Sequence, residues 1–113
     1  VVDGQTARGC AWYSLPPLGT ALYISQAVGN SPSISAYKKK YEGLTRWRQD
    51  LLIDGRTVGV EEDGLGGCMT YVQSGAAGVT TGTSSIGADK RSIDEQCDKA
   101  IAFTRATIAR IPP

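Results

Sequence analysis

Apolar and polar residues alternate along several short segments of this chain, and a period of two is typical of strands with one face against a core. In residues 46–53, apolar side chains are expected on one side of the strand and charged side chains on the other. The apolar side would hold Trp47, Leu51 and Ile53, and the charged side Arg46, Arg48 and Asp50. Strands are predicted at residues 9–15, 20–28, 46–53, 56–62, 68–73 and 79–85.

Asp54 and Gly55 separate the third predicted strand from the fourth. An Asp-Gly pair between two alternating runs is a strong hairpin signal, because both residues tolerate the positive φ of a type I′ turn. Glycine-containing turns at residues 63–67 and 74–78 separate the strands that follow. The strands from residue 46 onward are therefore expected to form an antiparallel meander.

A short helix is predicted after the second strand. Ser31 would be its N-cap, Pro32 its first residue, and Gly43 its left-handed C-terminal cap. The residues expected to face the sheet are Ile34, Tyr37, Tyr41 and Leu44.

The C-terminal segment gives the clearest helical pattern. Ser92 and Glu95 form a capping box at its start, and Pro112 and Pro113 end it. Its apolar stripe consists of Ile93, Cys97, Ala100, Ile101, Thr104, Ile108 and Ile111. The predicted fold is a single α+β domain over residues 1–113, with an antiparallel meander sheet of about six strands on which this helix and the shorter one pack.

Composition narrows the possible functions. The net charge of +1 gives no general signal for nucleic acid or membrane surfaces. Histidine is absent from the sequence, which removes the commonest general base and the commonest metal ligand. No apolar stretch approaches the roughly 18 residues that span a bilayer. The chain opens within a globular pattern, so we interpret it as a mature or truncated form.

Three cysteines are present, so at least one lacks a partner within the chain. Cys10 and Cys68 each begin a predicted strand, and a disulfide between them would join the first strand to the meander. Two buried free thiols are the alternative. Cys97 lies on the apolar helix stripe beside three acidic residues, whose charges disfavour a thiolate. Three dispersed cysteines without histidine do not form a zinc site.

Three further motifs are candidates for chemistry. Ser35 and Lys38 match the S-x-x-K pattern of serine acyl enzymes, but the companion motifs are missing, so a solvated helix face is favoured. Residues 63–67 resemble a phosphate loop only loosely, and a tight turn explains them better. The acidic residues 61–63 lack the spacing of an EF-hand. We predict neither a cofactor nor a metal.

Basic and aromatic residues are interleaved between positions 37 and 48. This segment is the candidate partner-binding surface, for an anionic polymer, a lipid headgroup or a protein. Its residues are Tyr37, Lys38, Lys39, Lys40, Tyr41, Arg46, Trp47 and Arg48. A merely solvated surface is the alternative interpretation.

Several short motifs together resemble those of an actinobacterial, mycobacterial-type secreted lipoprotein domain of unknown function. They are Gly9-Cys-Ala-Trp12, the segment LLIDGRTVGVEE at 51–62, Gly67-Cys68, Asp94-Glu-Gln-Cys97-Asp-Lys-Ala100 and Ile108-Ala-Arg-Ile-Pro-Pro113. The resemblance covers nearly the whole chain, with Val58 where the family usually has alanine.

The resemblance implies export, an oxidising compartment and a lipid anchor upstream of this chain. The family also has an upstream helical segment with a fourth cysteine. By this resemblance Cys97 is expected to be unpaired here, or to pair with that missing cysteine. The family brings no established catalytic residues.

We therefore expect a non-enzymatic cell-envelope domain that binds a ligand or protein partner outside the membrane. It would be extracellular, attached to the membrane only through the upstream lipid anchor, and would not bind nucleic acid. The alternatives are a structural, accessory or sensor domain acting through protein contacts, and a small serine hydrolase using Ser35 and Lys38.

Overall fold

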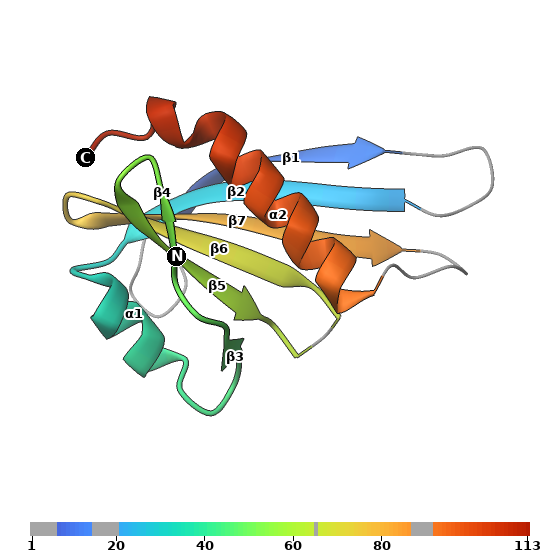
Figure 1. Cartoon of the computed structure of the whole chain (residues 1–113), viewed down its shortest axis with the longest axis horizontal. Helices are drawn as coiled ribbons and strands as arrows, with labels where there is room; N and C mark the ends of the chain where they lie inside the picture. The colour runs from blue at the N-terminus through green and yellow to red at the C-terminus, as the bar shows by residue number, and fades with distance from the viewer. Residues whose placement is uncertain (1–6, 15–20, 65, 87–91) are drawn as a thin grey trace.

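The computed structural model of this chain describes residues 7–14, 21–64, 66–86 and 92–113. Within these ranges it consists of one antiparallel sheet and two α-helices (Figure 1), so the predicted α+β fold is confirmed. The elements are β1 (Ala7–Ser14), β2 (Ala21–Asn30), α1 (Ile34–Lys40), β3 (Arg46–Trp47), β4 (Leu51–Ile53), β5 (Arg56–Glu62), β6 (Cys68–Ser74), β7 (Ala77–Ile86), α2 (Ile93–Thr107) and the 3-10 helix η1 (Ile108–Arg110).

The strands lie in the order β1-β2-β7-β6-β5-β3, and β4 also pairs with β5. Strands β4 to β7 form the predicted meander, with every neighbouring pair antiparallel. The β1–β2 hairpin adds to the far side of β7, through the pairing of β2 with β7. The first hairpin of the chain thus lies beside the last strand.

The predicted strand 46–53 is divided into β3 and β4 by a β-bulge. Trp47 pairs with Glu61, whereas Leu51 pairs with Val58. The three residues between Trp47 and Leu51 therefore oppose only two residues of β5. The extra residue reverses the alternation, so Trp47 lies on the face opposite to Leu51 and Ile53, and the prediction of one shared side is wrong.

The predicted hairpin turn is present, whereas the N-cap of the short helix differs from the prediction. Asp54 and Gly55 both have positive φ, of 50° and 75°, which confirms the predicted hairpin turn. Helix α1 begins later than predicted, because its N-cap is Ser33, whose Oγ accepts a hydrogen bond from the Ala36 amide. Ser31 is instead buried, where its Oγ accepts a hydrogen bond from the Tyr71 hydroxyl.

Helix α2 begins at the predicted cap, where the Ser92 Oγ accepts a hydrogen bond from the Glu95 amide. It lies across one face of the sheet, mainly over β5, β6 and β7 (Figure 1). Its last turn tightens into η1, which still buries Ile108. The predicted apolar stripe is therefore confirmed on the face toward the sheet.

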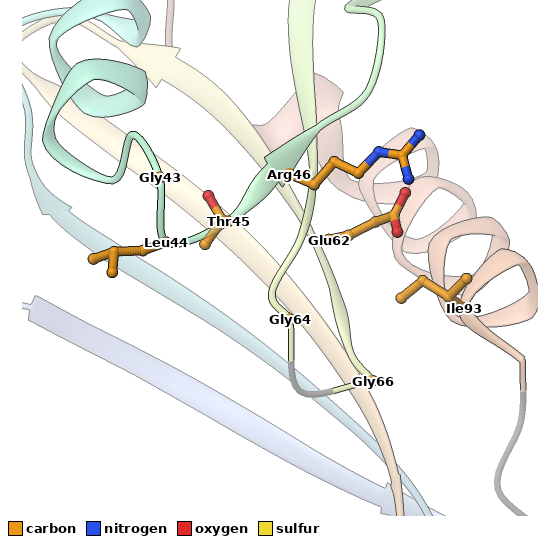
Figure 2. A pocket seen from close by; sticks show the side chains of 8 residues that line it. All are labelled: Gly43, Leu44, Thr45, Arg46, Glu62, Gly64, Gly66 and Ile93. Carbon is orange, nitrogen blue, oxygen red and sulfur yellow. The ribbon is translucent and has the colours of Figure 1, made fainter.

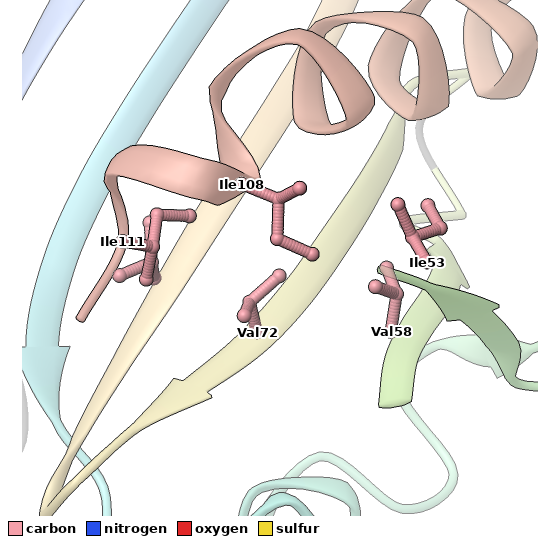
Figure 3. Close-up of a cluster of buried hydrophobic side chains, with 6 residues drawn as sticks. Ile53, Val58, Val72, Ile108 and Ile111 are labelled. Carbon is pink, nitrogen blue, oxygen red and sulfur yellow. The ribbon is translucent and has the colours of Figure 1, made fainter. Parts of the chain in front are cut away.

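The main core fills the space between α2, η1 and the strands beneath them (Figure 3). It consists of Ile53, Val58, Val72, Val79, Ile108 and Ile111. Each fully buried aliphatic side chain of this size contributes about 1.5–3 kcal/mol by leaving water. Polar groups in the same interface bond to each other, such as the Thr70 and Thr104 hydroxyls, 2.5 Å apart.

Candidate functional site

The disulfide in this structure joins Cys68 of β6 to Cys97 of α2, so the predicted Cys10–Cys68 bridge is wrong. Strand β1 lies three positions from β6, and at about 4.8 Å per strand this separates them by about 14 Å. A disulfide needs Cα atoms within about 7 Å. Cys97 meets this condition because α2 crosses directly over β6, with a Cα–Cα distance of 5.0 Å.

The expectation that Cys97 lacks a partner within the chain is wrong for the same reason. Cys68 and Cys97 are both fully buried and pack with Val60. The free, exposed cysteine is Cys10, on β1. The sequence signal that pointed to the true pair was the place of Cys97 on the stripe that faces the sheet.

The predicted partner-binding surface is divided between the two faces of the sheet. Tyr37 does not extend into solvent but packs against other rings on the α1 side. Its ring centroid lies 4.8 Å from that of Tyr41, 5.8 Å from that of Trp47 and 4.5 Å from that of Tyr71. These aromatic residues serve mainly to attach α1 to the sheet.

The three lysines of α1 differ in their surroundings. The Lys38 ammonium donates a hydrogen bond to Asp50 at 2.6 Å and lies 5.0 Å from the centroid of a Trp47 ring. Lys39 and Lys40 are exposed, and Lys40 lies over the Tyr41 ring. Lys39 and Lys40 are therefore the lysines of α1 with the most accessible side chains.

Arg46 and Arg48 belong to the other side of the sheet. The Arg48 guanidinium bonds to Glu62 at 3.0 Å and to Asp94 at 2.7 Å. These bonds to carboxylates raise the pKa of Arg48. Arg46 pairs across the strands with Glu62. The eight residues of the candidate surface therefore do not form one continuous site.

Arg46 and Glu62 also line a pocket of about 430 Å³ beside the start of α2 (Figure 2). The remaining lining residues are Gly43, Leu44, Thr45, Gly64, Gly66 and Ile93. Much of its wall is glycine backbone, and it holds one side chain of each charge. This pocket has no clear preference for a charged ligand.

Glu61 is a buried carboxyl group on the α1 side, with 3% of its surface exposed. Its Oε2 accepts a hydrogen bond from the Thr45 hydroxyl at 3.0 Å. Burial raises its pKa, with a further contribution from the charge of Asp63, while the bond from Thr45 acts in the opposite direction. Burial also raises the pKa of Tyr37, and the negative charge of Glu61 adds to this effect.

The remaining candidates from the sequence, the Ser35–Lys38 pair and the glycine-rich segment 63–67, have partners within the chain. The Lys38 side chain bonds to Asp50 at 2.6 Å, so the hydrolase alternative requires a different arrangement of Lys38. In the second candidate, the Gly67 amide donates to Asp63 Oδ1 at 2.9 Å, so the described amide at this position already has a partner within the chain. Across the described ranges, no three acidic, cysteine or histidine residues are grouped to hold a metal ion, and no helix is long and apolar enough to cross a membrane.

A groove of about 500 Å³ lies between the C-terminal half of α2 and the neighbouring strand β2, and sequence reasoning missed it. We call it the α2–β2 groove. It is lined by Gln26, Val28, Ser74, Val79, Phe103, Thr107, Arg110, Ile111 and Pro112. The feature that reveals it is Val28 of β2, a strand valine that is 46% exposed.

The polar groups in the α2–β2 groove are few and mostly fixed. The Gln26 side-chain amide donates to the Thr81 hydroxyl at 3.1 Å and to the Thr107 hydroxyl at 3.2 Å. Thr107 in turn donates to the Phe103 carbonyl. Gln26 thus bridges helix and sheet, and Arg110 is the charged side chain at the rim.

Comparison of the chain with protein-family models, with curated proteins and with solved structures found no match. The resemblance to the secreted lipoprotein domain therefore stays a prediction. The assignment of a function must rest on the geometry of the sites.

Proposed function

We propose that this chain is a non-enzymatic binding domain whose ligand occupies the α2–β2 groove. The observation that carries this proposal is the groove itself. Its volume of about 500 Å³ falls within the 300–1,000 Å³ typical of ligand sites. Its apolar lining with a few converging polar groups is also typical of such sites. A concave apolar site favours ligand binding over a purely structural, accessory or sensor role.

The walls of the groove are held in place by the core and by Arg56. Val79 and Ile111 line the groove and are also members of the main core. The Arg56 guanidinium donates hydrogen bonds to the carbonyls of Ile111, Pro112 and Gln73. A site with fixed walls loses little conformational entropy when it binds, so more of the contact energy appears as affinity.

The compartment proposed here is the outer side of a cell membrane. Disulfides form and persist in oxidising environments, and the Cys68–Cys97 bridge is compatible with such a location. The resemblance to a secreted lipoprotein domain adds the lipid anchor upstream of this chain. The expected pairing with an upstream cysteine now concerns Cys10, since Cys97 has its partner.

Titration with a neutral apolar fluorophore, N-phenyl-1-naphthylamine, tests the proposal. We expect saturable binding of one probe per chain. Val28→Trp should weaken it at least tenfold, because the indole fills the groove without changing charge. Leu52→Trp is the matched control, since Leu52 is 74% exposed and lies outside the groove. Absence of saturable binding, or equal binding by Val28→Trp, would contradict the proposed function.

The α1 end of the molecule supports a second candidate function, docking to anionic envelope material. The supporting observation is the exposure of Lys39 and Lys40. The double variant Lys39→Glu/Lys40→Glu, which keeps the Lys38–Asp50 pair, should abolish such binding. Lys99→Glu/Arg105→Glu is the charge-matched control, because both residues are exposed on α2. Equal binding by the two variants would reject this docking surface.

A further inference from the structure

We infer that the ligand of the α2–β2 groove is a single-chain anionic amphiphile, a long-chain fatty carboxylate, with its carboxylate at Arg110 and its alkyl chain on the apolar floor. This inference rests on the proposed function, because it names the chemical class of ligand for the same groove. Three features of the groove support it: its charge, its floor and the state of the backbone around it.

Among the residues that the structure describes, the charge at the groove has one sign. None of these lining residues is acidic, and residues 21–30, 74–86 and 99–113 contain neither Asp nor Glu. Arg110 is exposed at the rim and forms no ion pair within the described part of the chain. On α2, the nearest acidic residue in sequence is Asp98, about 18 Å away along the helix axis. A ligand with a negative end therefore meets a positive group, and the described lining residues offer no competing carboxylate.

The floor is suited to an alkyl chain. Val28, Val79, Phe103 and Ile111 supply its apolar surface. The side-chain amide of Gln26 already donates hydrogen bonds to two threonine hydroxyls. A ligand therefore does not need a polar group at this place to satisfy it. Removing an alkyl chain from water in such a groove contributes roughly 0.8 kcal/mol per buried CH₂ group.

The backbone around the groove argues against a peptide ligand. Strand β2 is paired on one side with β1 and on the other with β7, so its amides and carbonyls are already bonded. A bound peptide would bury its own backbone groups without partners, which carries a free-energy penalty for each group. An alkyl chain has no such groups. The groove therefore favours a hydrocarbon chain.

Arg110 suits a carboxylate because a guanidinium can donate two parallel hydrogen bonds to its two oxygens. A free fatty carboxylate can place its head at the rim while its whole chain lies in the groove. A lipid that remains in a bilayer cannot, because its chains stay in the membrane. We therefore assign the free molecule as the ligand, and the membrane surface is tested as a separate outcome.

Displacement of N-phenyl-1-naphthylamine by laurate and by dodecanol, below micelle-forming concentrations, tests the inference. Laurate should bind the native protein roughly tenfold more tightly than dodecanol, as expected for one charge-assisted interaction. Arg110→Gln should remove this difference by weakening laurate alone. Arg105→Gln is the matched control, because Arg105 is an exposed arginine of α2 outside the groove.

The outcomes separate the two proposals. Failure of the fluorophore to bind would reject the proposed function and this inference together. Binding of the fluorophore with equal affinities for laurate and dodecanol, or with no effect of Arg110→Gln, would overturn the inference alone. Co-sedimentation with phosphatidylglycerol vesicles that depends on Arg110, without displacement by laurate, would also overturn it by identifying a membrane surface as the partner.

Discussion

The two halves of the sheet on the α2 side have similar residues but different surroundings. Over β5 and β6 the helix excludes water, and Val58, Val60 and Val72 expose at most 1% of their surface. On β2, Val28 exposes 46% although it is also a strand valine. The covered half therefore supplies stability, and the other half supplies accessible apolar surface.

The width of one helix explains this difference. A helix with its side chains is about 10 Å wide and strands lie about 4.8 Å apart, so one helix covers about two or three strands. The sheet is wider than that, with an order that runs from β1 to β3. The Cys68–Cys97 disulfide fixes α2 over β6 and so determines which half is covered. The α2–β2 groove is the boundary between the halves.

The largest expected contrast is between two neighbouring residues of β4. Ile53→Ala should lower the free energy of unfolding by about 3 kcal/mol, because it removes a side chain that is 1% exposed and leaves a cavity in the main core. Leu52→Ala should change it by less than about 0.5 kcal/mol, since Leu52 is 74% exposed. Urea unfolding followed by circular dichroism measures both. Equal losses would show that the covered half is not the source of stability.

Removal of the disulfide tests what holds the helix over its half of the sheet. Cys68→Ala/Cys97→Ala should lower the free energy of unfolding by about 3 kcal/mol, because the bridge closes a loop of 29 residues in the unfolded chain. Cys10→Ala should have little effect, since that thiol is free and exposed. Guanidinium unfolding with and without reductant provides the measurement. A loss for Cys10→Ala as large as that for the double variant would contradict the assigned pairing.

Turns and helix caps were predictable from sequence, whereas the order of the strands in the sheet and the position of α2 on it were not. The Asp54-Gly55 turn and the Ser92 cap depend on neighbouring residues, and both predictions were confirmed. The Cys10–Cys68 pairing failed because it depended on strand order, which periodicity does not reveal. The α2–β2 groove was missed for the same reason, since it exists only through the position of α2 beside β2.

The bulge between β3 and β4 shows a second limit. Alternation of apolar residues placed Trp47 and Leu51 on one side, but a single inserted residue placed them on opposite faces. Trp47 consequently packs under α1, and the predicted basic and aromatic surface is divided. Nothing in the alternation marks where an extra residue is inserted, so the error was not avoidable from the pattern.

The face of the sheet toward α1 also has a covered region and an open region. Substitution of one glycine in each region tests this contrast. A Cβ on Gly59 would lie 2.9 Å from Trp47 Cζ3 and 3.1 Å from Ile34 Cδ1, so Gly59→Ala should destabilise the protein by about 1–3 kcal/mol. A Cβ on Gly82 of β7 would lie 3.3 Å from the Ser25 hydroxyl oxygen. We expect Gly82→Ala to change stability by less than about 1 kcal/mol. Thermal unfolding should show a lower midpoint for Gly59→Ala than for Gly82→Ala. A larger loss of stability for Gly82→Ala would mean that the tighter packing lies over β7.

The smallest expected effect concerns Glu61, a carboxyl group buried on the α1 side of the sheet. Burial raises the folded-state pKa of Glu61 above its unfolded value. The stability linked to such a group is present below the unfolded pKa and is lost as pH rises through the folded pKa. Native protein should therefore lose stability relative to Glu61→Gln as the pH increases from about 4 to about 8. Urea unfolding of both proteins across this range provides the measurement.

Glu42→Gln is the matched control for this pH dependence, because Glu42 is an exposed carboxylate in the loop after α1. It should follow the pH profile of the native protein, whereas Glu61→Gln should diverge from it progressively at higher pH. The Thr45 hydrogen bond to Glu61 stabilises the ionised form and limits the divergence. Parallel profiles for all three proteins would mean that water reaches Glu61 in solution, and the α1 side would then be more open than its burial indicates.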